Sequence, residues 1–143
     1  MTLVLQGQIR GGKNNVQITR TGHRYPNASF AKWRDEAVAQ IHAMFINATR
    51  RCGKTNLVNI MLSELPYLTR CEAIIDYTPG DLKVRDVPAM MDALWSVLVK
   101  AGVLADDGLI RKVVWREHPL DRKAPMVRIT LTKLNSAAAI GGK

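Results

Sequence analysis

The sequence contains only two cysteines, Cys52 and Cys71, and no apolar run long enough to cross a bilayer. Because the two cysteines are far apart in the chain, they predict neither a zinc site of the CxxC type nor a disulfide framework. Residues 1–6 lack the basic and then apolar build of a signal peptide. We therefore expect a cytoplasmic protein that makes no membrane contact and keeps both thiols reduced and buried.

Acidic residues are also scarce, since 12 Asp and Glu stand against 21 Lys and Arg, which gives a net charge of +9. No acidic residue precedes Asp35, and a second basic stretch follows Asp107. Such a surplus favours a polyanionic partner, DNA or RNA, because Lys and Arg release the counterions of the phosphates they neutralise. An anionic membrane is less favoured, since these cations do not lie on one face of an apolar helix.

The hydrophobic pattern predicts an α+β fold in a single domain over residues 1–135, followed by a flexible tail over residues 136–143. Runs of alternating or continuous apolar residues indicate the strands. We expect them at residues 3–9, 15–19, 69–77, 109–115 and 126–131. A glycine-bearing hairpin across residues 10–14 should join the first two. Residues 47–66 remain without assignment, because part of this segment fits both a strand and a short helix.

Two helices are predicted, and both should pack on one face of a mixed β-sheet. The first should begin at Asn27 or Ser29, either of which can cap it. Its apolar face is formed by Phe30, Trp33, Ala37, Ile41 and Met44. The second should begin near Pro88, which suits the first turn of a helix, and stop at residues 100–102. Its apolar stripe is formed by Met91, Leu94, Trp95 and Leu98.

Carboxylates flank this second helix, with Asp86 before it and the pair Asp106 and Asp107 after it. Acid concentrated in a basic chain indicates a divalent cation, because Mg²⁺ takes a few carboxylate oxygens and completes its shell with water and phosphate. Asp76 and Asp81 are further possible ligands. The structural alternatives are a helix cap at Asp86 and a simple turn at residues 106–108.

Several motifs occur in an order that is typical of one family. They are Leu-Gln-Gly-Gln at residues 5–8, Tyr25-Pro26 before a helix with Trp33, Arg85-Asp86, Ala93-Leu94, Lys100-Ala101-Gly102 and Asp106-Asp107. With these motifs the chain resembles the RusA-type Holliday junction resolvases, small phage-associated endonucleases that cut four-way DNA junctions. The resemblance covers most of the chain and is poorest over residues 47–68.

In that family, two aspartates of an Asp-Leu-Asp-Asn motif and the last aspartate of a later pair bind catalytic magnesium. The resemblance places the first of these on Asp86 and the last on Asp107, while Pro88 stands where the second is expected. A lysine used by the family falls on Asp92. Two interpretations follow: either Asp92 replaces the lost ligand in a site of Asp86, Asp92 and Asp107, or the metal site is impaired.

The resemblance thus implies a Mg²⁺-dependent endonuclease, with Mn²⁺ as a possible substitute, that resolves four-way junctions as a C2 homodimer in the host cytoplasm. Lys83, beside the carboxylates, joins the catalytic candidates Asp86, Asp92 and Asp107. The candidates for contact with DNA phosphates are Lys13, Arg20, Arg24, Lys83, Arg85 and Arg111. Lys83 and Arg85 could also be ion-pair partners of nearby carboxylates. The alternatives are a catalytically impaired, dimeric branched-DNA-binding protein of phage recombination or packaging and, less favoured, a generic RNA-binding domain.

Overall fold

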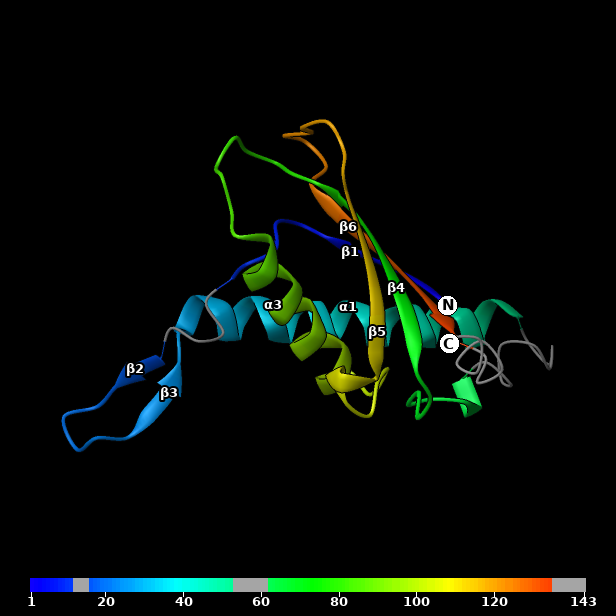
Figure 1. Ribbon diagram of the computed structural model, residues 1–143, viewed down its shortest axis with the longest axis horizontal. Coiled ribbons are helices and arrows are strands. Elements are labelled where there is room, and N and C mark those ends of the chain that lie inside the picture. Colours follow the sequence, from blue (N-terminus) through cyan, green and yellow to red (C-terminus); the bar gives the residue numbers. More distant parts are fainter. Residues whose placement is uncertain (12–15, 53–61, 135–143) are drawn as a thin grey trace, which may run out of the picture.

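The computed structural model describes residues 1–11, 16–52 and 62–134 of the chain. Its elements form a four-stranded sheet, a separate two-stranded sheet and two long helices (Figure 1). In chain order they are β1 (Thr2–Gln6), β2 (Val16–Ile18), β3 (Arg24–Pro26), α1 (Ala28–Cys52), β4 (Cys71–Thr78), α3 (Val87–Lys100), the 3-10 turn η1 (Asp107–Leu109), β5 (Ile110–Glu117) and β6 (Met126–Lys133).

The larger sheet has the strand order β1-β6-β4-β5. Strand β6 runs antiparallel to both of its neighbours, β1 and β4, whereas β4 and β5 are parallel and are connected through α3. The sheet is therefore mixed, and the prediction of an α+β fold is confirmed. The strands predicted at residues 69–77, 109–115 and 126–131 correspond to β4, β5 and β6 with small shifts at their ends.

One face of the sheet is buried, and buried and more exposed residues alternate strictly along β4. In β4, Cys71, Ala73, Ile75 and Tyr77 are buried, while the residues between them are partly exposed. Buried side chains of both helices join those of β1, β4 and β6 in one apolar cluster. The two helices thus cover the same face of the sheet, as the sequence predicts.

Helix α1 begins where Asn27 caps it. The Asn27 side-chain oxygen accepts hydrogen bonds from the backbone N–H (2.9 Å) and the hydroxyl (2.7 Å) of Ser29. Phe30, Ala37 and Ile41 of the predicted apolar face are buried. The helix continues to Cys52, so the first part of the unassigned segment is helical.

Helix α3 is delimited as its sequence predicts. Asp86 occupies the N-cap position, although its side chain makes no capping hydrogen bond, and Pro88 lies in the first turn. At the other end Gly102 has a φ of +76°, a conformation that glycine adopts without a steric cost. The N–H of Val103 donates to the carbonyl of Leu98 (2.9 Å) and that of Gly102 to Val99 (3.1 Å), which is the Schellman pattern of helix termination.

The predicted hairpin between residues 3–9 and 15–19 is wrong. Strand β1 pairs with β6, with Leu3 opposite Ile129, because the alternating leucines of β1 are buried only in the main sheet. Strand β2 pairs instead with β3, which the sequence did not predict since its three residues show no apolar alternation. Residues 16–26, which we call the arm, extend away from the sheet (Figure 1).

Parts of the predictions fall outside the described residues: Lys13, residues 53–61 and the tail over residues 136–143. The Cys71 thiol is buried and free, and burial raises its pKa, which suits an unreactive structural thiol. The side chain of Cys52 is not described. Within the described ranges, no helix combines the length and apolar content that a bilayer crossing requires.

The packing of α3 predicts that replacing its buried Leu98 destabilises the fold far more than replacing the exposed Leu68, which lies outside the helix. Leu98 is 0% exposed and Leu68 is 74% exposed. Leu98→Ala should lower the free energy of unfolding by about 2–5 kcal/mol, because it leaves a cavity in the core. The matched variant Leu68→Ala should change it by less than about 0.5 kcal/mol. Urea denaturation of both variants measures the difference, and equal effects would contradict the placement of α3.

Candidate nucleic-acid interface

Two loops lie together at one end of the large sheet. Residues 79–86, the 79–86 loop, follow β4, and residues 118–125 follow β5. Because β4 and β5 are parallel, their carboxyl ends meet at the same edge (Figure 1). The N–H of Asp121 donates to the carbonyl of Pro79 (2.9 Å), and a Cβ on Gly80 would lie only 2.8 Å from that of Pro125. Glycine at position 80 therefore permits the close approach of the two loops.

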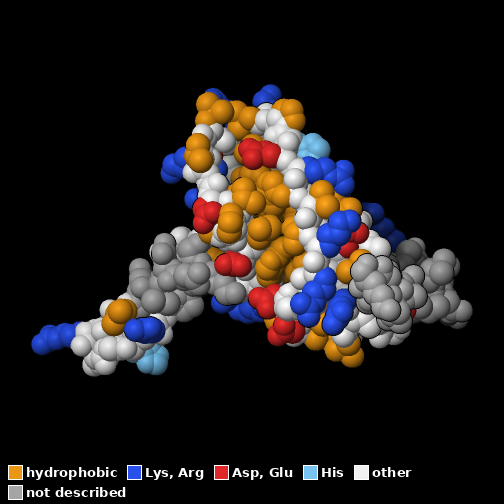
Figure 2. Space-filling model, viewed as in Figure 1, with side chains coloured by type: hydrophobic (Ala, Val, Ile, Leu, Met, Phe, Trp, Pro, Cys, Tyr) orange, Lys and Arg blue, Asp and Glu red, His pale blue; other side chains and the backbone are white. Residues whose placement is uncertain are grey.

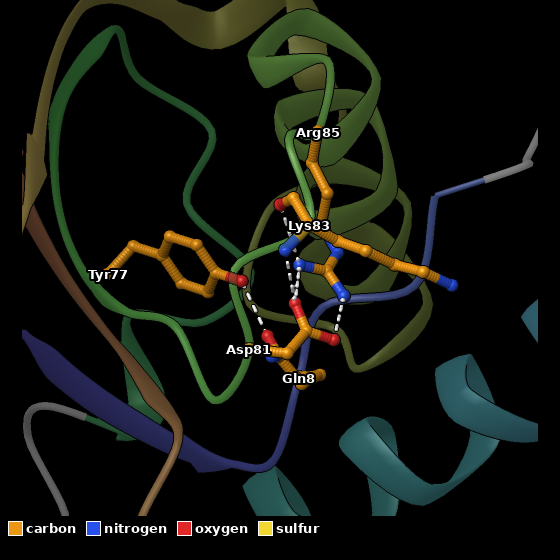
Figure 3. A network of polar contacts seen from close by, with 5 residues as sticks. All are labelled: Gln8, Tyr77, Asp81, Lys83 and Arg85. Carbon is orange, nitrogen blue, oxygen red and sulfur yellow. Dashed lines mark hydrogen bonds and ion pairs between the residues drawn. The ribbon is translucent and has the colours of Figure 1, made fainter. Parts of the chain in front are cut away.

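An ion pair closes the 79–86 loop (Figure 3). The two terminal nitrogens of Arg85 donate to the two carboxylate oxygens of Asp81 at 2.6 and 2.8 Å, which is a bidentate pair. Asp81 also accepts from the backbone N–H of Lys83 (3.1 Å), and Arg85 donates to the Lys83 carbonyl (3.2 Å). The Arg85 guanidinium lowers the pKa of Asp81 to about 2, so this carboxylate is ionised at neutral pH.

Gln8 attaches the loop to the segment that follows β1. With its amide nitrogen toward Tyr77, Gln8 donates to the Tyr77 hydroxyl (2.5 Å). Its amide oxygen then accepts from the backbone N–H groups of Gly80 (2.7 Å) and Asp81 (3.0 Å). Tyr77 is buried beside Trp115, with ring centroids 5.6 Å apart, and burial raises the pKa of its hydroxyl. The 79–86 loop is therefore held both by its own ion pair and by the core.

The predicted DNA-binding residues of this loop differ in what they can contact. Arg85 is engaged by Asp81 and its side chain is only 17% exposed, so the ion-pair interpretation describes it. Lys83 is exposed, and its side chain extends away from Asp81 (Figure 3). The sequence indicated Asp81 as a possible metal ligand, Gln8 as part of a family motif and Tyr77 as a strand residue, but no contact among the three. The four-residue spacing of Asp81 and Arg85 is the signal that could have indicated this ion pair.

The carboxylates that flank α3 lie toward opposite ends of that helix. Asp106 and Asp107 line an open depression of about 190 Å³ together with Ser96 and Val99. Asp92 is exposed and lies one helical turn before Ser96 on the same side of α3. Asp86 precedes Ser96 by ten residues, which corresponds to roughly 15 Å along a helix axis. Asp107 thus shares a region with Asp92 and not with Asp86.

The carboxylates around α3 fit a magnesium site with only one or two protein ligands. In the described ranges, no three or more His, Cys, Asp or Glu side chains are grouped so that they could hold a metal ion. One oxygen of Asp106 already accepts from the N–H of Gly108 (2.7 Å). Mg²⁺ is often held by only one or two carboxylates, with water and phosphate as its other ligands. Asp107 in the depression offers one such carboxylate. A site formed jointly by Asp86, Asp92 and Asp107 does not fit this arrangement.

The other ligand candidates are engaged elsewhere. Asp76 lies 2.9 Å from the Nε2 atom of His118 and 3.6 Å from the Nε atom of Arg116, and Asp81 is paired with Arg85. Both carboxylates therefore have cationic or polar partners in the structure. Neither is among the residues that line the depression.

Lys and Arg side chains lie toward the edges of the face drawn in Figure 2. Figure 2 shows an apolar strip on this face, with Asp and Glu side chains along it and Lys and Arg side chains on the arm, at the loops and on the β5 side. On the arm, Arg20 and Arg24 are exposed, and Arg111 is exposed at the start of β5. The arm's turn is closed by the Thr19 N–H, which donates to the His23 carbonyl (2.8 Å). Together with Lys83, four of the predicted phosphate contacts are thus accessible.

Comparison of the chain with models of protein families and with curated protein sequences gives no match. The functional interpretation therefore depends on the residues and their arrangement.

The Asp81–Arg85 pair predicts an acid titration. The carboxyl pKa of Asp81 is about 2 in the folded chain and 3.8 without the interaction. A lowered folded-state pKa stabilises the fold above the unfolded value, and this contribution is lost as the pH falls from about 4 to about 2. In a carboxyl ¹³C NMR titration, Asp81 should have its midpoint near pH 2, and Arg85→Gln should move it toward 3.8. A midpoint near 3.8 in the unmodified protein would contradict the ion pair.

Proposed function

We propose that this protein is a Mg²⁺-dependent, structure-selective DNA endonuclease that resolves four-way junctions as a homodimer. The observation that carries the proposal is the open depression lined by Asp106 and Asp107, together with the exposed cations Arg20, Arg24 and Arg111. Cations at the edge would bind the phosphate backbone, and the carboxylates would lie where that backbone passes. The ordered motifs shared with the RusA-type resolvases support the same activity, and two symmetric cuts require a twofold dimer.

Asp107 is the main candidate for holding Mg²⁺, with Asp106 and Asp92 as neighbours. When bound, Mg²⁺ supplies Lewis-acid polarisation of a phosphate and lowers the pKa of a water. The protein's own contribution is to position the DNA strand, since Lys83, Arg20, Arg24 and Arg111 neutralise phosphates without reading bases. Asp86 remains a ligand candidate by resemblance alone.

A second function is favoured by the altered carboxylates. Pro88 takes the place of an expected ligand, and the described residues form no group of three acidic ligands. A protein with this change would bind branched DNA as a dimer in phage recombination or packaging and leave it intact. Both functions predict that the protein binds a junction more tightly than a linear duplex, so binding assays do not distinguish them. Cleavage assays do, because only the endonuclease cuts the junction.

The endonuclease proposal predicts Mg²⁺-dependent cuts in a synthetic four-way junction. Asp107→Asn should reduce the cleavage rate by about 100-fold or more while junction binding persists, because it removes a charged ligand beside the phosphate. Glu36→Gln, an exposed carboxylate of α1, is the matched control and should cleave normally. Binding without cleavage by the unmodified protein would favour the second function. Equal affinity for junction and duplex would contradict both.

The arm predicts a change in the salt dependence of binding. If Arg20 and Arg24 each neutralise a phosphate, replacing both with Gln should reduce the slope of log K against log salt concentration by roughly 2. Replacing Arg50 and Arg51, which are exposed at the far end of α1, is the matched control and should leave the slope unchanged. Fluorescence anisotropy with a labelled junction at several salt concentrations measures both. An unchanged slope in the arm variant would exclude the arm from the interface.

A further inference from the structure

The 79–86 loop exposes two aliphatic side chains to solvent. Leu82 is 77% exposed and Val84 is 100% exposed, and the two flank the exposed Lys83. Single exposed aliphatic residues are common on protein surfaces and need no explanation. Two in one short loop, with a cation between them, are a pattern that binding surfaces use.

The loop is fixed in this conformation before any partner binds. The bidentate Asp81–Arg85 pair closes it, and the Asp81 carboxylate holds the Lys83 N–H (Figure 3). The Gln8 amide oxygen accepts from the backbone N–H groups of residues 80 and 81. A loop ordered in advance loses less conformational entropy on binding than a flexible one. These contacts therefore hold both aliphatic side chains in an exposed position. A loop without them would be free to turn the two side chains toward the protein.

The charge around the loop selects a polyanionic partner. Exposed cations at this end of the molecule include Lys83 and, in the neighbouring loop, Arg122 and Lys123. Two of the nearby carboxylates are engaged, since Asp81 is paired with Arg85 and Asp121 accepts from the backbone N–H groups of Lys123 (2.9 Å) and Ala124 (3.2 Å). A third, Asp86, is exposed at the end of the loop, where α3 begins. Two aliphatic side chains with an exposed lysine between them and two further cations in the neighbouring loop match a partner that has apolar surfaces between phosphates, which describes the base steps of DNA.

We propose that the 79–86 loop is a wedge whose side chains, Leu82 and Val84, insert between base pairs at the branch point of a four-way junction while Lys83 contacts the adjacent phosphate. The inference rests on the proposed function, because it names how a junction would be distinguished from a duplex. Branch points are the places where a base step opens most easily, so insertion there costs less unstacking energy than in a continuous helix. The wedge would thus provide selectivity for structure without reading bases.

The test uses a four-way junction with 2-aminopurine at the branch point, since this base becomes more fluorescent when it is unstacked. The unmodified protein should increase the fluorescence on binding. The variant Leu82→Ala/Val84→Ala should lose most of that increase and bind the junction about tenfold more weakly, with duplex affinity unchanged. Leu68→Ala, which alters a leucine that is 74% exposed elsewhere, is the control and should behave like the unmodified protein.

A second variant separates the side chains from the loop that holds them. Asp81→Ala keeps Leu82 and Val84 but removes the ion pair, so we expect an intermediate loss of the fluorescence change and of the preference for the junction over a duplex. The preference is the quantity compared, because the freed Arg85 strengthens binding to both DNA substrates. Circular dichroism melting should show that all variants remain folded, because both aliphatic side chains lie in solvent and the Asp81 side chain is itself 46% exposed.

Each failure has its own signature. If the unmodified protein binds and cuts the junction and the double variant gives the same fluorescence and affinity, the wedge is overturned while the proposed function stands. If the unmodified protein shows no preference for the junction over a duplex, the proposed function fails and the wedge fails with it. If the double variant loses affinity only for vesicles of anionic phospholipid and not for the junction, the loop is a lipid contact and the wedge is overturned.

Discussion

The parallel pairing of β4 with β5 is the constraint on which the arrangement of the candidate interface depends. Two parallel neighbours require a crossover, and α3 provides it on the face of the sheet that α1 also covers. The crossover places the loops after β4 and β5 at one edge and the turn before β5 at the other. The 79–86 loop and the depression with Asp107 are therefore separate regions connected by α3.

The local elements could largely be predicted from the sequence, whereas the pairing of the strands could not. Apolar runs identified β4 and β6, an apolar stripe identified α3, and Gly102 marked its end because few other residues adopt its backbone conformation. Alternation of apolar residues shows which face of a strand is buried, but it does not show which strand lies beside it. The glycines after β1 favoured a hairpin with the next strand, whereas β1 pairs with the distant β6, where its leucines are buried.

The candidate site shows the same limit at the level of single side chains. Residue type and spacing indicated the carboxylates around α3 and the cations of the arm and of β5. They did not show that Asp86 and Asp107 lie toward opposite ends of one helix, which follows from the crossover. Nor did they decide between phosphate contact and ion pair for Arg85, because that depends on the turn that brings Asp81 within 2.6 Å. Composition describes the available chemistry, and the connections between strands decide which groups meet.

The position of β5 in the strand order has a consequence for aggregation. In the described sheet β5 is an outermost strand, so the backbone N–H and C=O groups on its free side have no partner strand. Such a border is a template for unwanted intermolecular β-pairing and aggregation. Arg111, Lys112 and Arg116 are exposed along it, and charged side chains on an edge strand oppose its pairing with a strand of a second molecule. Basic side chains on β5 thus protect this edge of the sheet against aggregation.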